Sequence, residues 1–227
     1  MGSAIEVTQS MLPFTEQAFF DVFARYNAAI WPVHFIAHGL ALGAGLATMR
    51  PGAWSDRFVS VVLASLWLWT GIAYHLMFFA AINPPAIAFG LLFVAEGLVL
   101  AWSGGIRNRL HFAVRNDAAG LSGMTLAAFA VLGYPLAAAL AGHVWPQAAM
   151  FGVTPCPTTI FTLGMMLLVR PAPAWHLLVI PLAWSLIGGS AVWLIGITED
   201  IALPLAALVM LAVRFSARSA QLPPSAL

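Results

Sequence analysis

The stretch Trp31-Pro32-Val33-His34-Phe35-Ile36-Ala37-His38 opens a long apolar run and carries two histidines four residues apart. On a helix, this spacing places both imidazole rings on one face, one turn apart. Ionisable groups are expensive inside a bilayer and usually have a use there. If the apolar run crosses a membrane, the two histidines are therefore candidates for a site.

The composition is that of a polytopic membrane protein. Of the 227 residues, 62% are hydrophobic and 7% are charged, whereas about 25% of the residues in a soluble domain are charged. All nine basic residues are arginine, which excludes a Schiff base on a helix lysine. A net charge of +1 gives no reason to expect nucleic acid as a partner. The single Cys156 excludes an intrachain disulfide framework.

Apolar runs separated by turn signals predict an all-α membrane protein with seven transmembrane helices. An amphipathic helix from Phe14 to Ile30, with Thr15 as its N-cap, precedes them, and we expect it to lie in the outer membrane interface. The fifth span is short unless the irregular stretch 147–157 before it dips into the membrane as a re-entrant segment. The expected spans are 32–49, 58–82, 86–103, 118–142, 158–168, 175–195 and 201–215.

The arginines predict the orientation of these spans. Arg25 belongs to the interfacial helix, and the others lie in alternate connections: Arg50, Arg57, Arg107, Arg109, Arg115, Arg170, Arg214 and Arg218. The positive-inside rule therefore predicts the amino terminus outside and the carboxy terminus in the cytoplasm. The expected organisation is an N-terminal segment at 1–31, a transmembrane domain at 32–216 and a disordered cytoplasmic tail at 217–227.

Four of the six histidines fall in the outer half of the membrane when depth is counted at about 1.5 Å per residue. His34 lies roughly 5 Å deep, and His38 and His75 both lie roughly 10 Å deep on consecutive helices. Neutral imidazoles can ligate copper, zinc or iron, and a pair such as His38 and His75 can bind haem from both sides. The sequence therefore predicts a transition-metal or haem site near the outer face, built from His34, His38, His75, His143 and Cys156.

Two other functions remain open at this point. Glu96, roughly 17 Å deep, lies near the midplane, where a carboxyl group needs a partner or a proton. It favours a proton or small-solute pathway, to which Tyr74, Glu199 and Asp200 would also belong, although the last two have a simpler role as a helix cap. The third function is that of an accessory subunit in a homo-oligomer or membrane complex, whose polar residues only join helices. Whether the protein is an enzyme is left open.

Four segments resemble an uncharacterised family of bacterial polytopic membrane proteins that is known as a domain of unknown function. They are YNAAIWP at 26–32, NPP at 83–85, MFGVTPCPTT at 150–159 and WSLIGGS at 184–190. The resemblance covers nearly the whole chain and implies a multi-pass protein of the bacterial inner membrane. The expected partners are the lipid bilayer and, from the polar residues above, a metal or small solute. It brings no activity with it, but it makes the Pro-Cys-Pro-Thr-Thr segment a stronger candidate for the site.

Overall fold

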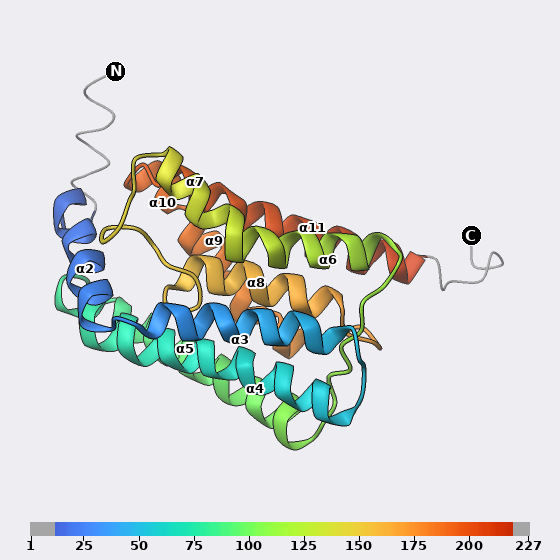
Figure 1. The fold of residues 1–227 in the computed structure, drawn as a ribbon. Helices are drawn as coiled ribbons and strands as arrows, with labels where there is room; N and C mark the ends of the chain where they lie inside the picture. Colours follow the sequence, from blue (N-terminus) through green and yellow to red (C-terminus); the bar gives the residue numbers. More distant parts are fainter. Residues whose placement is uncertain (1–11, 220–227) are drawn as a thin grey trace.

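The computed structural model describes residues 12–219, which form a bundle of helices running mostly along one direction (Figure 1). The prediction of an all-α protein is confirmed for this part of the chain, which contains one isolated β-bridge and no strand. The α-helices are α2 (Glu16–Ala29), α3 (Val33–Thr48), α4 (Ala53–Trp69), α5 (Ala86–Leu100), α6 (Ala118–Ala128), α7 (Tyr134–Leu140), α8 (Pro155–Leu167), α9 (Val179–Gly189), α10 (Ala191–Leu194) and α11 (Ala202–Ser219).

Three of the long helices pass through a π-helical segment, in which the turn is wider than in an α-helix. These segments are η1 (Thr70–Phe78) after α4, η3 (Ala101–Ile106) after α5, and η4 (Phe129–Gly133) between α6 and α7. Short 3₁₀ turns complete the chain: η2 (Phe79–Ala81), η5 (Trp175–Leu177) and η6 (Thr198–Ile201). The π-helical segments each add one residue to a helix, and such segments often lie at functional sites.

Within residues 12–219, four continuous helical stretches are long and apolar enough to cross a membrane, and a fifth is added if α2 and α3 together form one bent span. The four are Ala53–Ala81, Ala86–Ile106, Ala118–Leu140 and Trp175–Leu194. The number of seven spans stays a prediction, because α3 has 16 residues and α8 has 13. At about 1.5 Å per residue, α8 reaches about 20 Å, which is less than the hydrocarbon thickness of about 30 Å.

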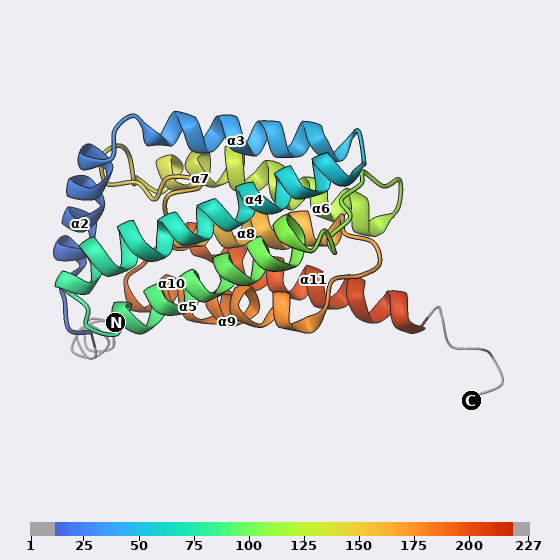
Figure 2. The same cartoon turned by 90° about the horizontal axis from the view of Figure 1, so that it is seen from below.

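Helix α2 runs across one end of the bundle, which we call the α2 end (Figure 2). It begins after Thr15, whose hydroxyl accepts a hydrogen bond from the backbone N–H of Ala18 at 3.2 Å, and it meets α3 at 83°. Its inner face packs on the bundle through buried aromatic residues, including Phe23 and Tyr26. Its place in a membrane interface stays a prediction.

Helix α8 lies in the centre of the bundle, with α6 and α11 on one side and α3, α4 and α5 on the other (Figure 1). Every residue of α8 is buried. The helix begins at Pro155, three residues earlier than predicted, because a proline without an N–H fits the first turn of a helix. The expectation of irregular backbone up to residue 157 was therefore wrong, since the Pro-Cys-Pro segment is helical.

The connections at 49–52, 107–117 and 168–174 carry most of the arginines, and we call them the arginine loops. They close the opposite end of the bundle, which we call the arginine end (Figure 1). Asp117 caps α6 by accepting a hydrogen bond from the N–H of Gly120 at 2.9 Å, and it pairs with Arg115 and with Arg170. The hydrogen bond from Gly120 and the pairing with Arg115 hold the pKa of Asp117 below its ordinary value. Beyond this end, α11 continues to Ser219, so residues 217–219 of the predicted tail are helical, and residues 220–227 lie outside the described range.

We expect Gly164→Ala to destabilise the protein by about 1–3 kcal/mol through overpacking. A Cβ on Gly164 would lie 2.7 Å from the carbonyl oxygen of Gly123 and 2.8 Å from the backbone nitrogen of Ala127, where α8 and α6 touch. Gly39→Ala is the matched control, because a Cβ on Gly39 meets no atom within 4 Å. Unfolding in detergent measures both variants, and equal stability of the two would contradict the close contact.

Candidate functional site

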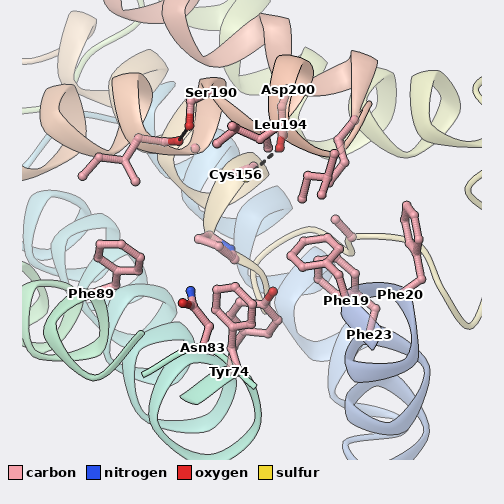
Figure 3. Close-up of a pocket in the computed structure, with 18 of the residues that line it drawn as sticks. Phe19, Phe20, Phe23, Tyr74, Asn83, Phe89, Cys156, Ser190, Leu194 and Asp200 are labelled. Carbon is pink, nitrogen blue, oxygen red and sulfur yellow. Dashed lines mark hydrogen bonds between the residues drawn. The ribbon is translucent and has the colours of Figure 1, made fainter. Parts of the chain in front are cut away.

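A cavity of about 320 Å³ lies at the α2 end, between α2, η1, the start of α5, α9 and η6 (Figure 3). Its walls are mainly aromatic. They include Phe14, Phe19, Phe20, Phe23, Phe79, Phe89 and Trp184. Four of these phenylalanines come from α2 and the turn before it, so this helix forms one side of the cavity.

One wall of the cavity carries two acidic residues from η6. Asp200 accepts a hydrogen bond from the hydroxyl of Tyr134 at 2.5 Å and another from the thiol of Cys156 at 3.4 Å. Glu199 is joined to Nδ1 of His143 at 2.8 Å, while its second oxygen, Oε2, is buried without a partner in the described structure. Burial raises the pKa of Asp200 to about 7, and the hydrogen bonds from Tyr134 and Cys156 only partly offset this effect.

The facing wall carries polar groups from η1 and the turn after it. Tyr74 and Asn83 lie across the cavity from Cys156 and Asp200 (Figure 3). His75 is fully buried, and neither of its ring nitrogens has a hydrogen-bond partner among the described residues. The indole of Trp184, whose ring centroid lies 5.1 Å from that of His75, also lies beside the thiol of Cys156. The cavity therefore has protonatable groups on two opposite sides.

The structure brings together most of the predicted site residues, but it divides the predicted metal site. Those that line the cavity are Tyr74, His75, His143, Cys156, Glu199 and Asp200. His34, His38 and Glu96 do not line it. Within residues 12–219, no group of three or more His, Cys, Asp or Glu side chains has a geometry that could hold a metal ion.

His34 and His38 connect α3 to its neighbours. Nε2 of His34 is 3.1 Å from the side-chain oxygen of Asn27, and its ring packs against Trp145. Nδ1–H of His38 donates to the carbonyl of His34 at 2.7 Å, and its ring packs on Phe151. His75, in contrast, has Phe89, Phe93 and Trp184 among its ring neighbours, so the two members of the predicted haem pair share no ring contact.

The sequence interpretation missed three polar residues of the site: Tyr134, Trp184 and Asn83. Each had a signal. Tyr134 is a polar aromatic residue directly before a proline in an apolar run, and Asn83 and Trp184 lie in two of the segments that carry the family resemblance. What the sequence could not supply was the convergence of these residues from α7, α9 and the turn before α5 on one cavity.

Fold and site together define a multi-pass helical protein of the membrane type. At one end of its bundle lies an aromatic cavity with polar groups on two facing walls. The chain belongs to a family of unknown function, DUF6064, whose sequence model matches residues 16–222. This match confirms the predicted resemblance to an uncharacterised family. No curated protein and no solved structure matches the chain.

We expect Asp200→Asn to flatten the pH dependence of folding stability. The raised pKa means that the folded state keeps a proton that the unfolded chain, with its ordinary value of 3.8, releases. Stability of the natural protein therefore falls as pH rises between about 4 and 7, by roughly 1–4 kcal/mol in total. The Asn side chain has no such proton to lose, so this loss disappears in the variant.

Unfolding of the natural protein and the variant at pH 5 and pH 8 measures this difference. Asp21→Asn is the matched control, since Asp21 is exposed on α2 and its carboxylate bonds to Gln17. An equal change of stability with pH in all three proteins would contradict a proton on buried Asp200.

Proposed function

We propose that the protein is a multi-pass membrane protein that binds a small, largely apolar molecule with oxygen hydrogen-bonding groups in the cavity at its α2 end. One observation carries the proposal: an aromatic cavity has polar groups on two facing walls, and several of them are buried without a partner in the described chain. Buried polar groups are costly unless something bonds to them, and a ligand can supply that bond.

The ligand class follows from the lining of the cavity. A volume of about 320 Å³ is at the small end of the range for ligand pockets, about 300–1,000 Å³. Phenylalanine and tryptophan rings favour a flat apolar body. Tyr74 and His75 on one side, and Glu199 and Asp200 on the other, favour hydroxyl or carbonyl groups at opposite ends of that body. A phenol or quinone type of ring has this chemistry.

The orientation supports access from the outer side of the membrane. The arginine loops lie at the end opposite the cavity, and the positive-inside rule assigns such loops to the cytoplasm. With the resemblance to bacterial proteins, this favours the inner membrane of a bacterium, the amino terminus outside and the cavity near the outer surface. It also supports the interfacial position predicted for α2.

A transition metal or haem is the second candidate occupant of this cavity. It is favoured by His75, because neither of its ring nitrogens has a hydrogen-bond partner among the described residues. His143 and Cys156 line the same cavity, whereas His34 and His38 do not. His143, Cys156 and His75 form no group of three that could hold a metal ion within residues 12–219, so this candidate rests on His75 alone.

We expect a small alkylphenol to protect Cys156 from modification. Cys156 is the only cysteine and lines the cavity, so N-ethylmaleimide reports on one position. With protein in lipid nanodiscs, 4-butylphenol should slow the modification by about tenfold. n-Butylbenzene lacks the hydroxyl group and so loses one hydrogen bond to the cavity wall, and it should therefore slow the modification less than 4-butylphenol does. The rate is measured by mass spectrometry of the intact protein.

Two variants locate the effect. His75→Phe should weaken the protection by 4-butylphenol, since it removes a hydrogen-bonding group from the wall. His38→Phe should leave the protection unchanged, because His38 lies outside the cavity. An unchanged rate of modification at every concentration of 4-butylphenol would overturn the proposed ligand class.

The metal candidate has its own test. The protein is purified without chelator and then incubated with haem or with zinc, copper or iron salts. We expect the His75→Phe variant to bind less haem or metal per protein than the natural protein does. Elemental analysis and the visible spectrum measure this. The same stoichiometry with and without His75 would exclude the cavity as the metal or haem site.

A further inference from the structure

Three polar side chains in the core of the bundle have no hydrogen-bond partner within the described chain. They are Thr70, through its hydroxyl, His75, through both ring nitrogens, and Glu96, through both carboxyl oxygens. Each has a relative exposure of 0%. Polar atoms left unbonded in an apolar interior are costly, so it matters whether the three side chains lie near enough to share bonding partners.

Thr70 and His75 lie on one face of the same helix. Both belong to η1, the π-helical segment, where backbone bonds reach residues five apart: the N–H of Phe79 bonds to the carbonyl of Tyr74 as well as to that of His75. In such a helix, residues five apart are little more than one turn apart and share a face. Thr70 is therefore placed one turn beneath His75, on the side that faces the interior.

Glu96 lies about one turn beyond Thr70, on the neighbouring helix. A Cβ on Gly71 would lie 2.9 Å from the carbonyl oxygen of Gly90, and a Cβ on Gly97 would lie 2.7 Å from the side chain of Leu68. The Cβ on Gly97 would also lie 3.0 Å from the carbonyl oxygen of Ala64. These contacts fix the antiparallel register of α4 and η1 against α5, and they place Glu96 opposite the α4 turn that precedes Thr70. Thr70 therefore lies between the levels of His75 and Glu96.

The same faces of the two helices meet in the core. Phe93, one turn above Glu96 on α5, has its ring centroid 4.8 Å from that of His75 and 4.3 Å from that of Trp67. Since residues three apart on a helix share a face, Glu96 points toward the interior that Phe93 occupies. Glu96, Thr70 and His75 therefore form one line of polar groups, which we call the polar track, with His75 at the cavity.

We propose that the polar track is hydrated and carries protons between the cavity and Glu96. Buried waters bond to polar groups that lack other partners, and a buried carboxyl group in a membrane segment is a candidate for proton exchange. In each transfer, the O–H bond of the Glu96 carboxyl group breaks as the next water gains that proton. The relay ends when a ring nitrogen of His75 takes up a proton, and the reverse relay returns it.

The polar track ends at Glu96. One turn further toward the arginine end, Leu100 on α5 and Leu63 on α4 are fully buried apolar side chains. The track therefore leads from the cavity to the centre of the bundle and stops there, so that Glu96 stores a proton for the cavity. This inference goes beyond ligand binding and does not depend on which molecule occupies the cavity.

Infrared spectroscopy of the protein in nanodiscs tests the polar track without any ligand. Asp200, whose pKa burial raises to about 7, gives a protonated-carboxyl band as well, so all spectra are compared in an Asp200→Asn background. In that background, the C=O band of a protonated carboxyl group should be absent after Glu96→Gln and present after Glu199→Gln, which is the matched control for another buried carboxyl group. On transfer to D₂O, this band should shift to its deuterated position. The shift should become slower by about tenfold or more in His75→Phe and in Thr70→Val, because each removes a polar step from the track.

Thr48→Val provides the control for the threonine variant, since Thr48 is buried at the arginine end and its hydroxyl bonds to the carbonyl of Gly45. It should leave the exchange rate of the Glu96 band unchanged. An ionised Glu96 in the natural protein, or an exchange rate that neither His75→Phe nor Thr70→Val alters, would overturn the proposal. Both results are independent of whether 4-butylphenol protects Cys156.

Discussion

The burial of α8 on every side is the constraint on which the rest of the structure depends. The helix can lie in the centre of the bundle because Gly123 and Gly164 let its backbone approach that of α6. Its threonine hydroxyls bond to carbonyls of the preceding turn, such as that of Thr158 to Thr154, so they add no unpaired groups to the core. A short central helix leaves space beyond its amino-terminal end, and the cavity lies in that space, with Cys156 at its edge.

The surroundings of this space come from chain segments that are far apart in the sequence. Helix α2 covers it from one side with phenylalanine rings, and η6 provides the acidic residues. Tyr26 and Asn27 hold α2 in place through hydrogen bonds to carbonyls of the 146–153 loop, and His34 bonds to Asn27 in turn. His34, at the start of α3, therefore helps to hold the helix that forms one wall of the cavity.

Sequence patterns predicted the helices best where a long apolar run has turn residues at both ends. The run predicted at 86–103 is continuous from Ala86 to Ile106, because Asn83-Pro84-Pro85 sets its start. The same reasoning failed at the start of α8, since Pro155 stops a helix when it lies inside one but begins a helix equally well. The pattern of arginines sorted the residues by depth, which was enough to place His75, His143 and Asp200 at one end of the bundle.

Depth alone could not predict which residues meet. His38 and His75 were assigned equal depth, yet their rings pack on different neighbours. His38 on α3 faces Phe151 of the loop before α8, whereas His75 on η1 faces Phe93 of α5 and Trp184 of α9. Lateral position depends on close contacts such as that of Gly71 with Gly90, which no periodicity encodes. Most of the polar residues predicted for the site therefore line the cavity, whereas the pair predicted to bind haem, His38 and His75, shares no ring contact.

The widened turn of η1 also bears on how this site can change over evolutionary time. A π-helical segment differs from an α-helix by one residue, so deleting one residue between Thr70 and Phe78 would restore a regular helix and turn the residues on one side of the deletion by about 100° relative to those on the other. Residues on opposite sides of the deletion, such as Thr70 and His75, would then no longer share a face. Insertions and deletions at this position, more than substitutions, should mark the point at which members of the family differ in what the cavity accepts.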